Sequence, residues 1–180
     1  MQRVAIVGCG GAGKSVLARK LGELTGIEVF HLDALLWRPG WVMTPKDEEL
    51  ALQQALIVRP TWIIDGNYGG TQPVRLEAAD TIVFLDLSRW ICLWRVVKRT
   101  IRYHRKTRPD MGPDCPERVD LGFWKWIWDY PAHSRPRTVA WIEQYREGRR
   151  IEVLNSPREV QAFLDRVRAE RVDPVSVADM

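Results

Sequence analysis

A glycine-rich segment near the amino terminus, residues 8–15, combines residue types that suit phosphate chemistry. It fits the pattern GxxxxGK(S/T), in which the glycines let successive backbone N–H groups turn toward an anion. A helix that begins near Lys14 adds its positive end, the Lys14 ammonium can reach the β- and γ-phosphates, and the Ser15 hydroxyl can hold Mg²⁺. The segment therefore predicts a site for ATP and Mg²⁺ made of Gly8, Gly10, Gly11, Ala12, Gly13, Lys14 and Ser15.

The same loop also fits a second pattern. Gly8, Gly10 and Gly13 spell GxGxxG, and Asp33 follows about twenty residues later, where a dinucleotide-binding fold places its ribose-binding acid. A dinucleotide loop has no use for the Lys14-Ser15 pair, whereas a triphosphate with Mg²⁺ needs a cation and a hydroxyl at these positions. Phosphoryl transfer is therefore favoured, and hydride transfer with a nicotinamide dinucleotide is the alternative.

Phosphoryl transfer needs metal support beyond Ser15, normally from an acid at the end of an apolar strand. Two acids qualify: Asp65 follows the apolar residues 62–64 and precedes a glycine, and Asp86 ends a similar run but precedes a helix. We favour Asp65 as the second metal ligand. We interpret Asp86 as a helix-terminal acid that the helix dipole and the nearby Arg89 stabilise.

The region after the second apolar run offers groups for a phosphoryl acceptor. Asp33 is predicted to orient or deprotonate an acceptor hydroxyl, or to join the metal shell, while His31 on the same strand face is interpreted as structural. Trp37 and Trp41 follow Asp33 and are suited either to the core or to the wall of a ring pocket. Aromatic residues spaced like Trp124, Trp126 and Trp128 are more typical of a core.

A basic helix is predicted after residue 87, because no acid occurs between there and residue 109. Its apolar face, which we expect to pack on the core, holds Ile91, Trp94, Val97 and Ile101. Its basic face suits solvent, nucleic acid, or a clamp on phosphates when a lid closes. We favour the clamp because a phosphoryl group in transfer needs cationic partners. The candidates are Arg95, Arg99, Arg108 and, from a second basic pair further on, Arg135.

Short β-branched runs alternate with helical patterns along the chain, which is typical of a parallel α/β sheet. Five strands are expected at residues 4–7, 28–32, 62–64, 81–85 and 151–154. Helices are expected at 14–24 and 158–168, and residues 171–180 are expected to form a frayed tail. The long segments 34–59 and 88–150 are read as insertions over the carboxyl edge of the sheet, where open α/β folds bind ligands.

Composition sets the class of protein. The chain has 180 residues, 46% of them hydrophobic and 28% charged, as in an ordinary globular domain. The formal net charge of +4 suits an anionic ligand but is too small for a nucleic-acid coat. Cys9, Cys92 and Cys115 form no CxxC pair, which disfavours a zinc site or a disulfide framework and favours a cytoplasmic location. No apolar stretch is long enough to predict a membrane span.

Several motifs together carry a family resemblance: residues 8–15, 31–33, 65–68, Arg75 with 79–80, 85–86, 90–95 and 108–111. The set resembles the adenylate-kinase-like P-loop proteins known as DNA topology modulation proteins (FlaR type), over nearly the whole chain. Only the P-loop motif is specific by itself. The resemblance implies a nucleoside-monophosphate-kinase-like fold in one domain over residues 1–170, with 34–59 as the acceptor-binding insert and about 103–137 as a basic lid.

Similarity to adenylate kinases makes Asp65-Gly66 the counterpart of their DG turn at the metal. Adenylate kinases continue with an aromatic-Pro-Arg triplet that grips the acceptor phosphate, whereas this chain has Asn67-Tyr68-Gly69, with Arg75 as a possible substitute. The predicted substrate-binding residues are Asp33, Trp37, Asn67 and Arg75. The sequence thus predicts an ATP-dependent kinase for an unidentified small-molecule acceptor. The alternative is an ATP-regulated nucleic-acid-associated protein, although no DNA-reading motif is recognisable.

Overall fold

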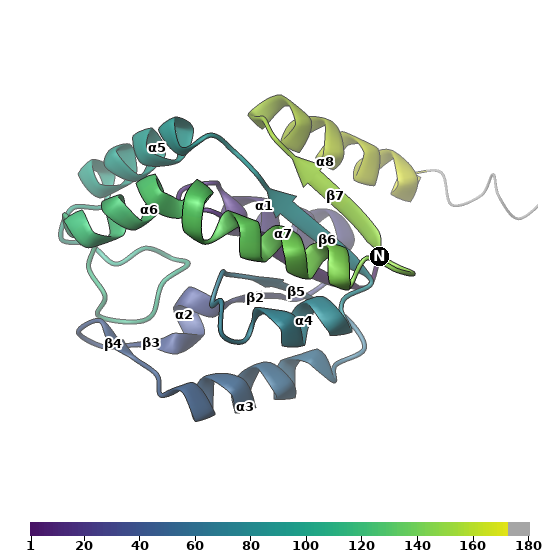
Figure 1. The fold of residues 1–180 in the computed structure, drawn as a ribbon, viewed down its shortest axis with the longest axis horizontal. Helices are drawn as coiled ribbons and strands as arrows, with labels where there is room; N and C mark the ends of the chain where they lie inside the picture. The colour runs from purple at the N-terminus through teal and green to yellow at the C-terminus, as the bar shows by residue number, and fades with distance from the viewer. Residues whose placement is uncertain (173–180) are drawn as a thin grey trace, which may run out of the picture.

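Five parallel strands form the centre of the structure, a computed structural model that describes residues 1–172 (Figure 1). The strands are β1 (Arg3–Gly8), β2 (Val29–His31), β5 (Trp62–Asp65), β6 (Thr81–Leu85) and β7 (Arg150–Leu154), in the order β2-β5-β1-β6-β7. Every neighbouring pair in this sheet is parallel. The predicted fold class, a parallel five-stranded α/β sheet, is confirmed.

The strand order decides between the two readings of the glycine-rich loop. β5 lies between β1 and β2, so the two first strands of the chain are not neighbours. In a dinucleotide-binding sheet the first two strands pair directly, in the order 3-2-1-4-5-6. The hydride-transfer alternative is therefore wrong at the level of topology, and Asp33 does not lie where that fold holds its ribose.

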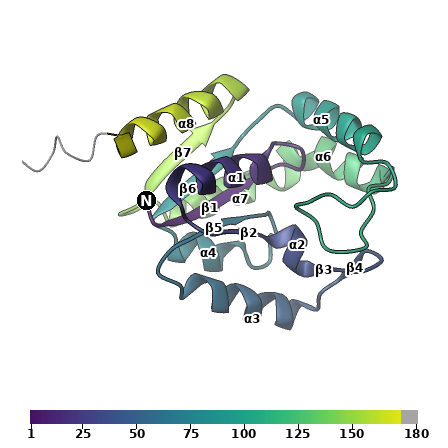
Figure 2. The same ribbon diagram turned by 180° about the vertical axis from the view of Figure 1, so that it is seen from behind.

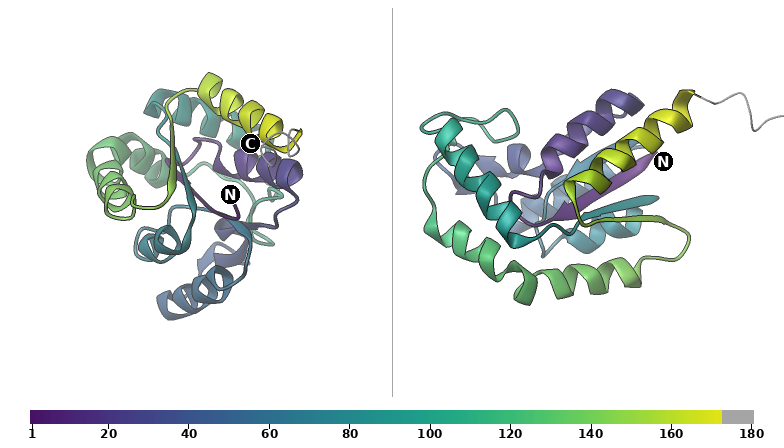
Figure 3. Two further views of the ribbon diagram at one scale, coloured as in Figure 1. Left: turned by 90° about the vertical axis from the view of Figure 1, so that its right-hand side faces the viewer. Right: turned by 90° about the horizontal axis from the view of Figure 1, so that it is seen from above.

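Two hydrophobic layers sandwich the sheet because alternate residues of each strand point to opposite faces. Val4 and Ile6 of β1 join a core with α1 (Lys14–Thr25), α5 (Arg89–Arg102), α6 (Leu121–His133) and α8 (Pro157–Val172). Ala5 and Val7 join the other core, with α2 (Leu32–Leu36), α3 (Lys46–Ile57), α4 (Gln72–Ala78) and α7 (Arg135–Gln144). Figure 2 shows α1 lying over the strands, and the end-on view in Figure 3 shows the layers.

The first long segment, 34–59, contains more than one element. It includes most of α2, a short antiparallel hairpin of β3 (Trp37–Arg38) and β4 (Val42–Met43), and α3. The second long segment contains α5, an irregular stretch at 103–120, α6 and α7. These elements place the hairpin and the irregular stretch beyond the carboxyl ends of the strands. The closing helix α8 is longer than predicted and includes Arg171 and Val172, while residues 173–180 of the expected tail lie outside the described residues.

The register of α5 differs from the prediction. The helix turns Cys92 and Val96 to the interior, whereas Trp94 and Ile101, predicted to pack inward, are 61% and 73% exposed. The reason is the close approach of α5 to the glycine-rich loop. A Cβ on Gly11 would collide with the Cys92 carbonyl oxygen and lie 2.8 Å from a Val96 methyl group. Only small side chains fit at this contact, so the bulky residues turn outward.

Within residues 1–172, none of the helices combines the length and the apolar character that crossing a membrane requires.

Candidate functional site

A cavity of about 1350 Å³ opens where the strands end at their carboxyl edge. The glycine-rich loop follows β1, Asp33 follows β2 and Asn67 follows β5, so three neighbouring strands deliver their following residues to one place. The predicted site residues that line the cavity are Gly10, Gly11, Ala12, Gly13, Lys14, Ser15, Asp33, Trp37, Asn67, Arg95, Arg99 and Arg108. Five separate segments between residues 10 and 108 thus meet at one cavity.

The phosphate loop is held in shape by its glycines. Gly11 and Gly13 have φ of 78° and 101°, which is left-handed backbone that favours glycine. The Ala12 N–H donates to the Cys9 carbonyl at 3.1 Å, and the Leu17 N–H donates to the Gly13 carbonyl at 2.9 Å as α1 begins. The loop therefore has the tight turn and the following helix start that phosphate binding requires.

Lys14 lies over this loop. Its Nζ donates to the Gly8 carbonyl at 2.9 Å and to the Cys9 carbonyl at 3.0 Å. These neutral acceptors leave the ammonium charge available to an anion. The Cys9 side chain is buried beside Cys92, and that neighbouring thiol together with burial raises the pKa of the Cys9 thiol. Cys9 is consequently a protonated, close-packed residue of the loop.

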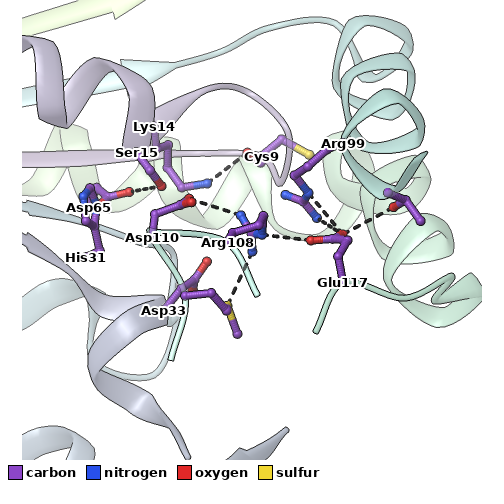
Figure 4. A network of polar contacts seen from close by, with 12 residues as sticks. Cys9, Lys14, Ser15, His31, Asp33, Asp65, Arg99, Arg108, Asp110 and Glu117 are labelled. Atoms are coloured by element: carbon purple, nitrogen blue, oxygen red, sulfur yellow. Dashed lines mark hydrogen bonds and ion pairs between the residues drawn. The ribbon is translucent and has the colours of Figure 1, made fainter. Parts of the chain in front are cut away.

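Asp65 connects the loop to the second strand. Ser15 Oγ donates to Asp65 Oδ2 at 2.8 Å, and His31 Nδ1 lies 2.5 Å from Asp65 Oδ1 (Figure 4). Asp65 is 3% exposed, so its carboxylate is fixed between these partners. The Asp65 hydrogen bond raises the pKa of His31, although the burial of the imidazole acts against this. The sequence predicted Ser15 and Asp65 as one set, whereas His31, interpreted there as structural, is the third member.

Ser15 and Asp65 supply two oxygen donors of the kind that Mg²⁺ prefers. They adjoin Lys14 and the loop N–H groups, so a metal held here would also reach a bound triphosphate. Among residues 1–172 there is no group of three or more His, Cys, Asp and Glu side chains that could hold a metal ion. The residues therefore fit a Mg²⁺ that enters with a nucleotide and completes its shell with phosphate and water oxygens.

Asp33 lies across the cavity, in the first turn of α2 rather than at the end of a strand. Its Oδ1 accepts a hydrogen bond from the Tyr68 hydroxyl at 2.8 Å. Burial and the nearby Asp33 charge raise the pKa of Tyr68, so the phenol remains a donor at neutral pH. Among the described residues, no donor reaches the second Asp33 oxygen, Oδ2. One carboxylate oxygen is thus oriented and the other is available to a ligand.

Arg75 does not line the cavity, in contrast to its predicted contact with substrate. It is fully buried, and its guanidinium donates to the Gln53 side chain at 2.8 Å, to the Gly66 carbonyl at 2.7 Å and to the Asn67 carbonyl at 2.5 Å. Burial lowers its pKa to about 10. Arg75 therefore fixes the loop after β5 from behind. Asn67 in turn accepts a hydrogen bond from the Gly8 N–H at 3.1 Å and ties this loop to the phosphate loop.

The basic side of the cavity comes mainly from α5 and the irregular stretch after it. Arg95 donates to the Ala12 carbonyl at 2.8 Å and so lies against the phosphate loop. The other cavity-lining cations in this region are Lys98, Arg99, Arg102, Arg108 and Arg118. Arg95 thus contacts the loop itself, while Arg99 and Arg108 line the cavity beside it.

Glu117 gathers two of these arginines, and the sequence analysis missed it. Arg99 donates to Glu117 Oε1 at 3.0 Å. Arg108 Nε forms an ion pair with Glu117 Oε2 at 2.8 Å, but the angles of this contact do not fit a hydrogen bond (Figure 4). Arg108 also bonds to Asp110 at 3.1 Å. Burial lowers the pKa of Arg99. Glu117 lies nine residues after Arg108 and 18 after Arg99, a spacing that gives no local pattern, so only the folded chain shows this pairing.

Arg135 lies away from the cavity. It forms a two-pronged contact with Asp86, with the Nη2 to Oδ2 distance at 2.6 Å. Arg89, predicted to stabilise Asp86, instead stacks over the Trp128 ring with its Cζ 4.1 Å from the centroid. Asp86 is therefore occupied by an ion pair between β6 and α7, and Arg135 anchors the start of α7.

The hairpin β3–β4 and the stretch 103–120 contact each other over the cavity. The Gly40 N–H donates to the Asp114 carbonyl at 3.0 Å, and Trp41 Nε1 donates to the Pro116 carbonyl at 3.0 Å. Trp37 and Trp41 pack edge to face with ring centroids 5.4 Å apart, and both line the cavity. This side of the cavity is thus covered by two segments whose contacting residues Trp41 and Pro116 are 75 positions apart in sequence.

The search of solved structures finds a shikimate kinase from Acinetobacter baumannii, solved in complex with shikimate. It is 15% identical, the match covers 96% of this chain and 93% of that chain, and the TM-score is 0.60. Two structures of a deoxyadenosine kinase from M. mycoides match at 13% and 14% identity over 92% of this chain and 98% of theirs, with TM-scores of 0.44 and 0.43. The chain has the fold of P-loop kinases.

No protein-family model matches the chain, and none of the curated proteins does. The resemblance to DNA topology modulation proteins therefore stays a prediction from the sequence.

Proposed function

We propose that this protein is a magnesium-requiring kinase that transfers the γ-phosphoryl group of ATP to a hydroxyl group of a small molecule. The proposal rests on the set of residues that the fold brings together around one cavity. A P-loop with Lys14 lies beside the Ser15-Asp65 pair, and an oriented carboxylate, Asp33, lies across the same space. The likeness of the fold to a shikimate kinase supports this reading.

On the nucleotide side, the loop N–H groups and Lys14 would bind the β- and γ-phosphates. Ser15 and Asp65 would hold Mg²⁺, which neutralises charge on the phosphates when it is bound. His31 orients the Asp65 carboxylate through its 2.5 Å contact. Arg95, Arg99 and Arg108 approach from α5 and the stretch after it, where they would stabilise the charge on the phosphoryl group in transfer.

On the acceptor side, Asp33 would accept the proton of the acceptor hydroxyl as its oxygen attacks the γ-phosphorus. The bond between the γ-phosphorus and the bridging oxygen breaks, and ADP leaves with that electron pair. Tyr68 keeps one Asp33 oxygen in place through the 2.8 Å hydrogen bond, so the other faces the ligand. Trp37 and Trp41 supply an apolar wall for the body of the acceptor.

The position of the α5 cations favours a role in clamping phosphates over a role in binding nucleic acid. Lys98, Arg99 and Arg102 of α5 line the cavity together with the phosphate loop. A small-molecule kinase uses these charges inside its own site, whereas a nucleic-acid contact would use them on an outer surface. We therefore place small-molecule phosphorylation before nucleic-acid binding.

The test is ADP release by the purified protein with ATP and Mg²⁺, alone and with nucleoside monophosphates, nucleosides and hydroxylated ring compounds as acceptors. We expect release that depends on one acceptor class. It should be lost in Lys14→Ala and retained in the matched variant Lys46→Ala, whose side chain is exposed at the start of α3. Slow hydrolysis that no acceptor stimulates, or undiminished turnover in Lys14→Ala, would overturn the proposal.

A further inference from the structure

A second hollow lies behind the loop that joins β5 to α4. Its volume is about 120 Å³, several times the ~30 Å³ that one water molecule occupies. We call it the rear pocket, and its polar wall consists of Gly69, Gln72, Tyr130, Ser134, Arg137 and Thr138. It also shares Asn67, Tyr68 and Trp126 with the main cavity. The rear pocket therefore adjoins the candidate active site but is a separate space.

Two side chains of the rear pocket are buried without a partner. Gln72 is 2% exposed and Tyr130 is 4% exposed. Gln72 Nε2 and the Tyr130 hydroxyl make no hydrogen bond to any described residue. A buried donor without a partner is costly, and folded proteins nearly always satisfy such groups with protein, water or a ligand. Both groups line the same hollow, so they indicate an occupant that accepts hydrogen bonds.

Arg137 gives the rear pocket its charge. Its Nη2 lies 2.6 Å from the position that a Cβ on Gly69 would take, so the guanidinium rests directly against the loop. Among residues 1–172 no carboxylate pairs with it, whereas Arg135, two residues earlier, is held by Asp86. No acid occurs among the described residues that line the pocket. The pocket thus combines one cation with uncharged donors and has a positive field.

We propose that the rear pocket binds a small oxyanion of the phosphate type. A guanidinium that presents several N–H donors, a side-chain amide and three hydroxyl groups match the several acceptor oxygens of such an ion. The volume of about 120 Å³ accommodates a tetrahedral ion. The lack of carboxylates excludes a metal cation as the occupant, because a divalent cation needs anionic oxygen ligands.

An oxyanion in the rear pocket would contact the loop after β5, which carries Tyr68 and through it orients the Asp33 carboxylate. Tyr68 borders both spaces, and its hydroxyl holds Asp33. The oxyanion has two possible sources: a free ion from solution, or an anionic group of the acceptor that reaches past Asn67 and Tyr68. The second source rests on the proposed function, whereas the pocket itself does not.

The test uses the full-length protein labelled with ¹⁵N and titrated with inorganic phosphate. The readouts are the backbone N–H of Gly69 and the side-chain amide of Gln72, which report on the rear pocket independently of the phosphate loop. We expect saturable shifts of both signals in the wild type and at least a tenfold weaker response in Arg137→Gln. The matched control is Arg146→Gln, an exposed arginine paired with Glu143, which should respond like the wild type.

A phosphomonoester, ribose 5-phosphate, provides the second arm. If ribose 5-phosphate shifts both the Gln72 amide signal and the Trp37 indole signal, the bound anion is part of an acceptor. If only inorganic phosphate shifts the Gln72 signal, the pocket binds a free ion from solution. Either result supports an oxyanion site in the rear pocket. Shifts confined to the amides of residues 10–13 in both arms, or equal responses in Arg137→Gln and wild type, would overturn it. Failure of the ATP turnover test leaves these signals unaffected, so the two proposals fail separately.

Discussion

At the proposed nucleotide end of the cavity, the consecutive residues 8–15, which begin with the last residue of β1, supply the loop, the lysine and the serine. At the acceptor end, Asp33 comes from α2, Tyr68 from the loop after β5, Trp37 and Trp41 from the hairpin region, and the cover from residues 103–120. One end is thus built from a single continuous segment, and the other from residues of four separate segments.

The cations that line the cavity also differ in how they are paired. Lys14 and Arg95 donate only to backbone carbonyls, so their charges are uncompensated and favour a strongly anionic ligand. Arg99 and Arg108 are instead paired with Glu117, and Arg108 also with Asp110. The comparison indicates that Lys14 and Arg95 keep an uncompensated charge for an anionic ligand, whereas carboxylates of the protein already neutralise part of the charge of Arg99 and Arg108.

The largest effect should come from Asp33→Asn. Loss of the proton acceptor is expected to lower kcat by ~10²–10⁴-fold, while the Kd of ATP stays unchanged because the nucleotide end is intact. Steady-state kinetics and ATP titration separate the two quantities. Asp47→Asn, at an exposed acid of α3, is the control. A matching loss of ATP affinity in Asp33→Asn would mean that the two ends are not separable.

Ser15→Ala should affect the opposite end. Removal of the hydroxyl takes away one predicted Mg²⁺ donor and the hydrogen bond to Asp65. We expect the Mg²⁺ concentration for half-maximal turnover to rise roughly 10–100-fold, with the KM of the acceptor unchanged. Ser15→Thr retains the hydroxyl and should restore the wild-type requirement. An unaltered Mg²⁺ dependence in Ser15→Ala would exclude Ser15 from the metal site.

Glu117→Gln tests how much the ion pairs of Glu117 with Arg99 and Arg108 stabilise the fold. The buried Glu117 carboxylate binds Arg99 and Arg108, and its loss leaves two partly buried cations without their counter-ion. The free energy of unfolding should fall by about 3 kcal/mol, measured by urea denaturation. Glu143→Gln removes a fully surface-exposed pair with Arg146 and should cost ~0.5 kcal/mol or less. Equal costs in the two variants would show that the Glu117 network is not a fixed part of the fold.

The smallest effect is expected at the amino edge of the sheet, remote from both ends. Partial burial acts to raise the pKa of Asp80, but hydrogen bonds from the Thr81 hydroxyl and the Arg3 and Gln2 N–H groups outweigh it and lower the pKa. The folded pKa lies below the unfolded value of about 3.9. The stabilisation is therefore complete above about pH 4 and is lost as the pH falls through the folded pKa.

Thermal denaturation of wild type and Asp80→Asn between pH 7 and pH 2 checks this expectation. The wild type should lose its advantage over the variant in the acidic range, and turnover per folded molecule at pH 7 should be equal. Parallel curves at every pH would contradict the lowered pKa of Asp80. A change in turnover would show that the amino edge is coupled to the cavity.

Some of the site could be predicted because its chemistry depends on local sequence. Residues 8–15 form one turn, so their types and spacing are visible directly, and the strands around them follow from β-branched runs. Asp65 was favoured over Asp86 because a glycine follows it, and the structure places its carboxylate 2.8 Å from Ser15. The paired partners His31, Tyr68 and Glu117 had no such local mark, since each meets its carboxylate or arginine only across the fold.

The arginines show where sequence reasoning stops. A basic residue looks the same in sequence whether it lines the cavity beside the glycine-rich loop, as Arg95 does, or is buried behind another loop, as Arg75 is. Arg135 looked like a clamp residue but is held by Asp86. The apolar periodicity of α5 also gave the wrong inward face, because the contact with Gly11 admits only small side chains.

Local sequence was enough to predict the parallel α/β class, the glycine-rich loop with Lys14 and Ser15, and Asp65 at the end of a strand. These features depend on residues that are neighbours along the chain or repeat with a regular period. The tertiary structure decided the strand order, the register of α5, the partner of each arginine and the existence of the rear pocket. Each of these depends on packing and charge pairing between residues tens of positions apart, and such long-range contacts leave no local pattern in a single sequence.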